Sequence, residues 1–212
     1  MKDSRKLTIM VSSTVYGIED LLDQIYTHLT AYGYEVWMSH KGTVPVDSSC
    51  TAFKSCLDAV DKCDLFLGLI TPQYGSGKDR RERSITHQEI LRAIKLKKPR
   101  WILAHDHVVF ARSLLENMGY KGKKGRKTLS IKKSQIMDDL RVIDMYEDAI
   151  ISQKPLRHRN GNWVQKYDKN NDAILFTTAQ FSRFQEADVF VQENFEDMER
   201  VNKALKDRGG HS

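Results

Sequence analysis

The feature that most constrains the fold of this chain is the run DLFLGLI at residues 64–70. Beyond its first residue the run has no polar position, which is typical of a strand buried on both faces of a parallel sheet. Pro72 and the turn residues 75–77 end the run, and Ser84 and Thr86 offer the start of a helix. Because ligands bind open α/β sheets at the carboxyl ends of strands, we expect Glu89, in the first turn of that helix, to lie beside a binding crevice.

Short apolar runs alternate with amphipathic segments through the first 118 residues. Strands are expected at residues 7–11, 34–38, 64–70 and 101–104, and helices at 18–29, 52–60 and from residue 86. This alternation predicts an α/β, flavodoxin-like fold, in which helices cover both faces of a parallel sheet. We therefore assign residues 1–118 to an α/β domain.

The segment at residues 119–133, GYKGKKGRKTLSIKK, has a different composition. It holds seven Lys or Arg, three Gly and no acid, so the net charge of +6 is concentrated there. We interpret it as a basic linker or loop. Its lysines could meet phosphate groups, but Tyr120 is the one aromatic residue near them, so specific nucleic-acid binding is not expected.

Residues 134–212 are predicted to form a mainly helical extension. Asn160-Gly161 is a turn signal between residues 156–159 and 163–167 and predicts a β-hairpin. Residues 173–178 suit a further strand. A long helix is expected at about residues 179–206, with apolar side chains at seven-residue steps: Phe184, Val191, Met198 and Leu205. These steps hint at a helix seam, but Asn194 interrupts the second register, which favours packing back onto the same domain over a dimeric coiled coil.

The composition is that of a soluble globular protein, with 40% hydrophobic and 29% charged residues. The first apolar run, residues 7–11, is too short for a secretion signal or a membrane span. We therefore expect a cytoplasmic protein that does not interact with membranes.

Neither cysteines nor histidines form a metal-binding pattern. The spacing of Cys50, Cys56 and Cys63 fits neither a zinc ribbon nor a redox pair, so buried free thiols are expected. The sequence His105-Asp106-His107 lacks a third ligand at a diagnostic spacing. We expect no metal.

Glu89 is the main candidate for chemistry, and its position allows two interpretations. Thr86 and Glu89 have the spacing of a capping box, in which the carboxylate bonds to the amide of the capping residue. Alternatively, a carboxylate held in a cleft could stabilise an oxocarbenium-like centre during cleavage of an N-glycosidic bond, or polarise a ribose hydroxyl.

Other residues near the same sheet edge are candidates for substrate binding, each with a structural alternative. Ser12, Ser13 and Thr14 follow the first strand and suit phosphate or ribose contacts, or else cap the next helix. The charged loop contains Arg80, Arg81 and Arg83, which could meet a diphosphate or lie in solvent.

Three ring-bearing side chains complete the set of candidates. Trp37 and Tyr74 could stack on a base or a nicotinamide ring, or belong to the core or its rim. His87 could act as an acid or base near neutral pH, or be an exposed helix residue. The motifs GxGxxG, GxxxxGK[ST] and GxSxG do not occur, which argues against a Rossmann dinucleotide fold, a P-loop enzyme and an α/β-hydrolase.

Three motifs occur in order along the chain: IMVSST at residues 9–14, CDLFLGLITPQYGSG at 63–77 and SITHQE at 84–89. Together they resemble the bacterial TIR-like domain-of-unknown-function family, over about residues 6–105. The resemblance implies a flavodoxin-like fold. Enzymatic members of the wider TIR-like superfamily cleave NAD at the nicotinamide–ribose bond, in prokaryotes often in antiviral defence.

By this resemblance, Glu89 matches the family's glutamate at the start of the helix after the central strand. The hydroxyl residues at positions 12–14 match the loop after the first strand. Tyr74, Gly75 and Ser84 match the loop and helix start around the pocket.

The resemblance implies an NAD glycohydrolase or ADP-ribosyl cyclase, with NAD as substrate and no further cofactor. A second hypothesis is a non-catalytic signalling or assembly module. It would bind an effector protein, or other copies of the chain, through the loop 39–49 and the C-terminal helix. A third is a nucleotide-binding or nucleoside deoxyribosyltransferase-like protein, which shares the carboxylate chemistry but does not act on NAD.

Overall fold

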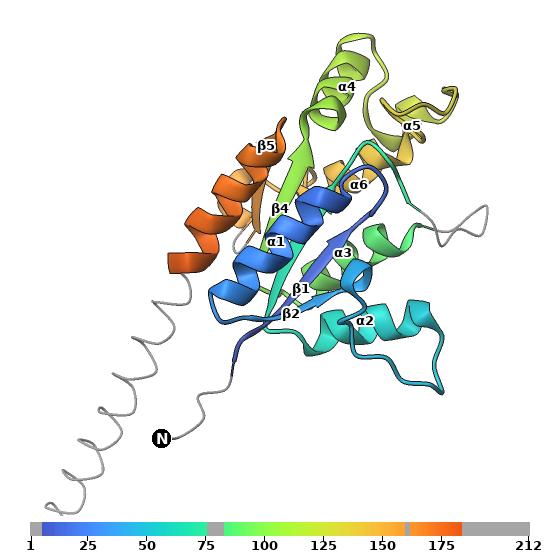
Figure 1. Cartoon of the computed structure of the whole chain (residues 1–212). Coiled ribbons are helices and arrows are strands. Elements are labelled where there is room, and N and C mark those ends of the chain that lie inside the picture. Colours follow the sequence, from blue (N-terminus) through green and yellow to red (C-terminus); the bar gives the residue numbers. More distant parts are fainter. Residues whose placement is uncertain (1–5, 76–82, 160–161, 184–212) are drawn as a thin grey trace, which may run out of the picture.

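Five parallel strands form one sheet in a computed structural model, which describes residues 6–75, 83–159 and 162–183 (Figure 1). Their order across the sheet is β2-β1-β3-β4-β5, and each neighbouring pair is parallel. The strands are β1 (Thr8–Ser13), β2 (Glu35–Met38), β3 (Leu65–Ile70), β4 (Arg100–His105) and β5 (Asn162–Tyr167). The predicted flavodoxin-like sheet is confirmed.

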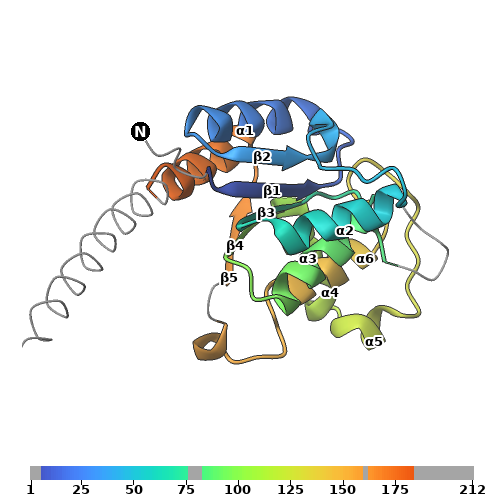
Figure 2. The ribbon, with the colours of Figure 1, turned by 90° about the horizontal axis from the view of Figure 1, so that it is seen from below.

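Helices cover both faces of this sheet (Figure 2). Helix α1 (Glu19–Ala31) and a helix that begins at residue 170 lie on one face. The other face is covered by α2 (Ala52–Lys62), α3 (Ile85–Lys95), α4 (Asp106–Asn117) and α6 (Arg141–Ala149). Three short helical elements complete the described fold: η1 (Ser39–Lys41), α5 (Gly122–Arg126) and η2 (Leu156–His158).

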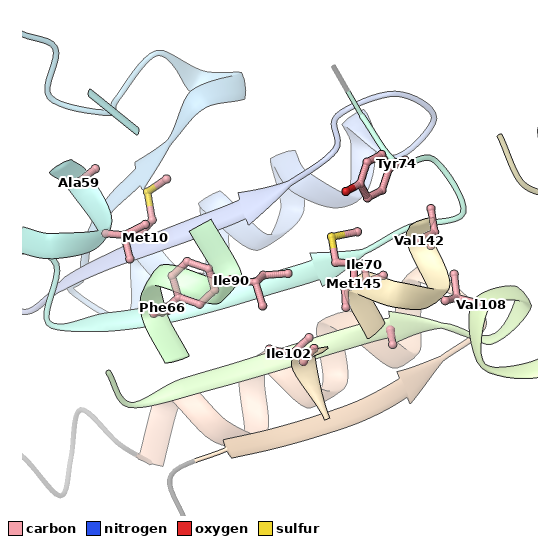
Figure 3. Close-up of a cluster of buried hydrophobic side chains, with 14 of the residues drawn as sticks. Met10, Ala59, Phe66, Ile70, Tyr74, Ile90, Ile102, Val108, Val142 and Met145 are labelled. Carbon is pink, nitrogen blue, oxygen red and sulfur yellow. The ribbon is translucent and has the colours of Figure 1, made fainter. Parts of the chain in front are cut away.

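Strand β3 lies at the centre of both hydrophobic clusters, and each of its residues is buried. Phe66 and Ile70 face the cluster with α2, α3 and α6, where Figure 3 shows them beside Ile90. Leu67 and its neighbours two positions away face α1. Since alternate residues enter two separate cores, neither face of the strand tolerates a polar side chain, which explains the uninterrupted apolar run.

The segment beyond residue 134 does not form the predicted hairpin among its described residues. Residues 156–158 are the 3₁₀ helix η2, and β5 pairs in parallel with β4 from Arg100↔Asn162 to His105↔Tyr167. The turn residues Asn160 and Gly161 lie outside the described part. The open edge of β4 thus takes its partner from beyond the domain edge predicted at residue 118, through a crossover that contains α6.

Residues 173–178, predicted as a strand, are helical. Ala173, Thr177 and Phe181 recur at four-residue steps and are all buried, so the segment has a helical period. The first residues of the predicted long helix, 179–183, continue this helix, and its remaining residues lie outside the described part.

The basic segment contains α5 and is attached to α6 through Arg126. This side chain is 4% exposed and donates to Asp144 Oδ1 at 2.6 Å and to Glu147 Oε2 at 2.6 Å. The sequence predicted a linker or loop because the acids that pair with Arg126 lie 18 and 21 residues further along the chain, in α6. Segment 119–133 is therefore held by buried ion pairs at this point.

The three cysteines are free thiols, but the predicted burial holds for one of them. Cys63 is buried, whereas Cys50 and Cys56 are half-buried. Within the described ranges, no helix has both the length and the apolar character needed to cross a membrane.

Candidate functional site

A pocket of about 380 Å³ lies at the carboxyl ends of β1 and β2, next to the end of β3. The connection after β1 runs to α1 on one face of the sheet and the connection after β3 runs to α3 on the other, so this is the switch point at which flavodoxin-like sheets bind ligands. The lining comes from the loop after β1, η1 and the first turns of α2 and α3. Its residues are Val11, Ser12, Ser13, Thr14, Val15, Tyr16, Leu22, Met38, Ser39, His40, Ala52, Cys56, Gly75, Ile85, Thr86 and Glu89.

Glu89 lines this pocket with a carboxyl group that is almost completely buried, at 3% exposure. Its Oε2 accepts a hydrogen bond from the Ser12 hydroxyl, and the Cys56 thiol is a second polar neighbour. Burial raises the pKa of Glu89, and the hydrogen bonds from Ser12 and Cys56 only partly offset this. A carboxyl group with a raised pKa can exchange a proton closer to neutral pH than an exposed one.

Glu89 does not form the predicted capping box, and the reason is that α3 begins earlier. Ser84 caps the helix, and its Oγ accepts from the amide of His87 at 3.4 Å. Thr86 is already helical, and Glu89 is the fifth helical residue, too far along to reach the capping amide. Its carboxyl group instead crosses to Ser12 at the end of β1.

The Cys56 thiol is the neighbour of Glu89 that the sequence did not identify. Burial, followed by the nearby Glu89 carboxyl, raises the pKa of this thiol. It also lies 3.8 Å from the Ser39 hydroxyl. The thiol therefore stays protonated and acts here as a weak hydrogen-bond donor rather than as a nucleophile.

The three hydroxyl residues at the end of β1, Ser12, Ser13 and Thr14, all line the pocket. Ser13 Oγ donates to the carbonyl of Thr14 at 3.0 Å. None of them caps α1, because Ile18 occupies the cap position and has no side-chain cap bond. Gly75 lies against Thr14: a Cβ at Gly75 would be 2.7 Å from Thr14 Oγ1, and its φ of +87° suits glycine.

Trp37, Tyr74, Ser84 and His87 do not line the pocket. Trp37 is 8% exposed in the core and donates from Nε1 to Glu35 Oε1 at 2.8 Å. Tyr74 is completely buried, and Figure 3 shows it among the core side chains. Neither ring is placed to stack on a ligand in this pocket, because each fills the core on the α2 and α3 side of the sheet.

His87 does not line the pocket but belongs to a chain of hydrogen-bonded polar side chains that also includes Tyr74, Asp148 and Lys123. Its Nδ1 lies 2.8 Å from the Tyr74 hydroxyl, and its Nε2 lies 2.9 Å from Asp148 Oδ2. Asp148 also accepts from Lys123 Nζ at 2.8 Å. Burial disfavours the charge on Asp148, but the hydrogen bonds from His87 and Lys123 outweigh burial and lower the pKa of that carboxyl. This chain fixes the start of α3 against α6 and the basic segment.

The arginines of the charged loop are only partly placed. Arg80 and Arg81 lie outside the described residues. Arg83 is exposed, does not line the pocket, and contributes its carbonyl as an acceptor for Gln88 Nε2 at 2.8 Å.

The described residues contain no group of three or more His, Cys, Asp or Glu side chains that could hold a metal ion. His105, considered above as a ligand, caps α4 by accepting from the amide of His107 at 3.2 Å.

A family of domains of unknown function, DUF4062, matches residues 8–207. The chain belongs to this family. The match includes β5 and the helix from residue 170, so the DUF4062 domain extends well beyond the residues that carry the TIR-like motifs. No curated protein shows significant similarity to the chain.

Three further pocket residues of this DUF4062 domain were not predicted from the sequence: Tyr16, Met38 and His40. Met38 is the last residue of β2 and His40 follows it, so the rule that ligands meet the carboxyl ends of neighbouring strands could have identified them. Cys56 had no such signal, because its position depends on how α2 packs against α3. His40 Nε2 lies 2.9 Å from Asp23 Oδ1, which orients the ring.

Proposed function

We propose that this pocket cleaves the N-glycosidic bond of a ribosyl nucleotide, with NAD as the substrate and Glu89 as the catalytic residue. One observation carries the proposal: a buried carboxyl group, bonded to Ser12, lines the pocket at the switch point of the sheet. The three motifs that resemble TIR-like proteins lie around this pocket, and that resemblance supports NAD as the substrate. It also supports a role in antiviral defence signalling.

The charge of the pocket is consistent with this substrate. Glu89 is its one carboxylate, and its described lining includes no Lys or Arg. Such a lining favours a neutral or cationic group, and the nicotinamide ring of NAD is a cation joined to a neutral ribose. The volume of about 380 Å³ is near the lower end of typical ligand pockets, so it suits the nicotinamide riboside half of NAD.

Cleavage would proceed as follows. The bond from ribose C1′ to the nicotinamide nitrogen breaks, its electron pair stays on that nitrogen, and nicotinamide leaves as a neutral molecule. The ionised Glu89 stabilises the positive charge that develops on the ribosyl group. Water then bonds to C1′ and gives its proton to Glu89, which returns it to solvent. In a cyclase, a nitrogen of the adenine ring would take the place of water.

Other side chains have supporting roles in this proposal. Ser12 holds the Glu89 carboxyl in one orientation. Tyr16 lines the pocket and is 68% exposed, so it is placed to stack on the nicotinamide, unlike Trp37 and Tyr74. The diphosphate would meet Arg80, Arg81 and Arg83, which follow the pocket residue Gly75 in the chain.

The test is nicotinamide release from NAD at high protein concentration, with products separated by chromatography. Glu89→Gln keeps the size of the side chain, and we expect it to lower the rate by about 10²–10³-fold. Glu19→Gln makes the same change at an exposed position outside the pocket and should leave the rate unchanged. A wild-type protein that binds a partner protein but releases no nicotinamide would instead support the assembly module.

The small pocket volume also favours a second candidate, a nucleoside N-glycosidase or deoxyribosyltransferase. This enzyme would use Glu89 in the same way but would need no diphosphate contacts. Release of free base from nucleosides or deoxynucleosides, with NAD left intact, would select this candidate.

A further inference from the structure

Of the three hydroxyl groups at the end of β1, two already form hydrogen bonds, and the third does not. Ser12 donates to Glu89, and Ser13 donates to the carbonyl of Thr14. Thr14 Oγ1 is buried and has no hydrogen-bond partner among the described residues, although Thr14 lines the pocket. A buried hydroxyl without a partner destabilises a fold, and a ligand group that bonds to it would remove this cost.

Gly75 covers this hydroxyl. A Cβ there would approach Thr14 Oγ1 to 2.7 Å, so only a glycine backbone lies so close without displacing it. A rotation of about 120° around χ1 of Thr14 moves the hydroxyl between staggered positions, and so can turn it toward the pocket that the residue lines.

The pocket indicates what such a hydroxyl would contact. With one carboxyl group and no Lys or Arg in its described lining, the pocket does not suit a phosphate, whereas a neutral hydroxyl can pair with Thr14. Ser12 and Thr14 are two residues apart, and two extended residues span about 6–7 Å. This span is comparable to a pentose ring with its hydroxyl groups.

We propose that the Thr14 hydroxyl binds the 2′ or 3′ hydroxyl of the ligand's ribose, and so makes the pocket selective for ribosides over the matching deoxyribosides. The inference rests on the proposed function in taking the ligand to be a ribosyl nucleotide. A site that pairs a buried hydroxyl with a ligand hydroxyl rejects the analogue that lacks it, because the protein group is then left unpaired.

The first test needs no ligand. Thr14→Val replaces the unpartnered hydroxyl with a methyl group of similar size, and should raise the Tm of the free protein by roughly 2–4 °C. Thr8→Val, at the start of β1, is the matched control, because Thr8 Oγ1 donates to Asp64 Oδ2 at 2.9 Å and accepts from the Asp64 amide at 3.0 Å. It should lower the Tm. A lower Tm in both variants would overturn the premise that Thr14 is unpartnered.

The second test is calorimetric binding of ADP-ribose, which lacks the nicotinamide bond and so is not turned over by the proposed activity. Two analogues lack either the 2′ or the 3′ hydroxyl of the terminal ribose, the one that carries nicotinamide in NAD. The wild type should bind one of these analogues about tenfold more weakly than ADP-ribose, a difference of about 1.4 kcal/mol. Thr14→Val should bind ADP-ribose about tenfold more weakly and show no preference, whereas Thr14→Ser should keep the preference.

The outcomes separate this inference from the proposed function. If ADP-ribose does not bind, or if wild type and Thr14→Val bind all three probes equally, the inference is wrong whether or not NAD is cleaved. If the Thr14-dependent preference is found while NAD stays intact, the inference stands and the proposed activity fails.

Discussion

Replacing Glu89 with Gln should make the protein more stable at neutral pH, while it removes activity. Burial raises the pKa of this carboxyl group in the folded protein above its ordinary value of 4.5. A raised pKa means that the folded state binds the proton more tightly than the unfolded state. Below the pKa of the unfolded state, both states are protonated and the carboxyl group costs no stability. Above that pKa, the unfolded state ionises more readily than the folded state, so stability falls as pH rises.

The size of the effect follows from the shift. Each unit by which folding raises the pKa costs about 1.4 kcal/mol at a pH above both values. For a domain of this size, that corresponds to a Tm difference of roughly 3–5 °C. Gln can still accept the hydrogen bond from Ser12, so the neutral variant avoids the ionisation cost and keeps that contact.

The assay is urea unfolding of wild type and Glu89→Gln at several pH values between about 4 and 8. The stability advantage of Glu89→Gln should be near zero at the acidic end and grow toward neutral pH. Glu19→Gln, at an exposed carboxyl group, corrects for the loss of one charge. If the Glu89→Gln variant loses stability relative to wild type as pH rises, the carboxyl is stabilised in its ionised form and the reasoning is refuted.

Three further changes test other parts of the structure. Gly75→Ala should lower the free energy of unfolding by about 1–3 kcal/mol in urea, because φ is +87° and the new Cβ meets Thr14; unchanged stability would contradict the close approach. Arg126→Met should cost about 3 kcal/mol, since the buried Glu147 carboxylate loses both hydrogen bonds from Arg126 and keeps the longer one from Arg112, at 3.3 Å; a loss below about 1 kcal/mol would mean that the ion pair is solvated. Asp148→Asn should destabilise most at neutral pH and progressively less as pH falls below about 4, because the folded pKa of Asp148 is lowered from 3.8; a pH-independent difference would exclude an ionised Asp148.

The sequence was sufficient to predict the sheet of the first half and its ligand edge. The apolar run of β3 and the alternation around it depend on local burial, which residue patterns record directly. Ser12, Thr14 and Glu89 were placed in one crevice because strand ends in a parallel sheet meet at one edge.

The second half could not be predicted in the same way, because its structure depends on contacts distant in sequence. Strand β5 is half exposed, and nothing in its residues shows that its partner is the open edge of β4. The Asn160-Gly161 pair gave a stronger local signal, and it predicted a hairpin that the described residues do not form. The buried pairing of Arg126 with α6 was equally invisible in a segment that reads as a charged linker.

Within the site, the errors concern which way side chains point. Trp37 and Met38 are adjacent in β2, yet Met38 lines the pocket and Trp37 fills the core. The choice between them depends on the register and twist of the sheet. For Glu89, the spacing from Thr86 suggested a capping box, but α3 begins at Ile85, so Ser84, the other helix start that the sequence offered, is the cap.

The account depends most on the Glu89 carboxyl as the reactive group of the pocket. The most direct measurement is the rate of nicotinamide release at saturating NAD, compared between wild type and Glu89→Gln after both are shown to be folded by their urea midpoints. We predict measurable release by the wild type and a rate about 10²–10³-fold lower for the variant. Equal rates in the two proteins would contradict the central claim.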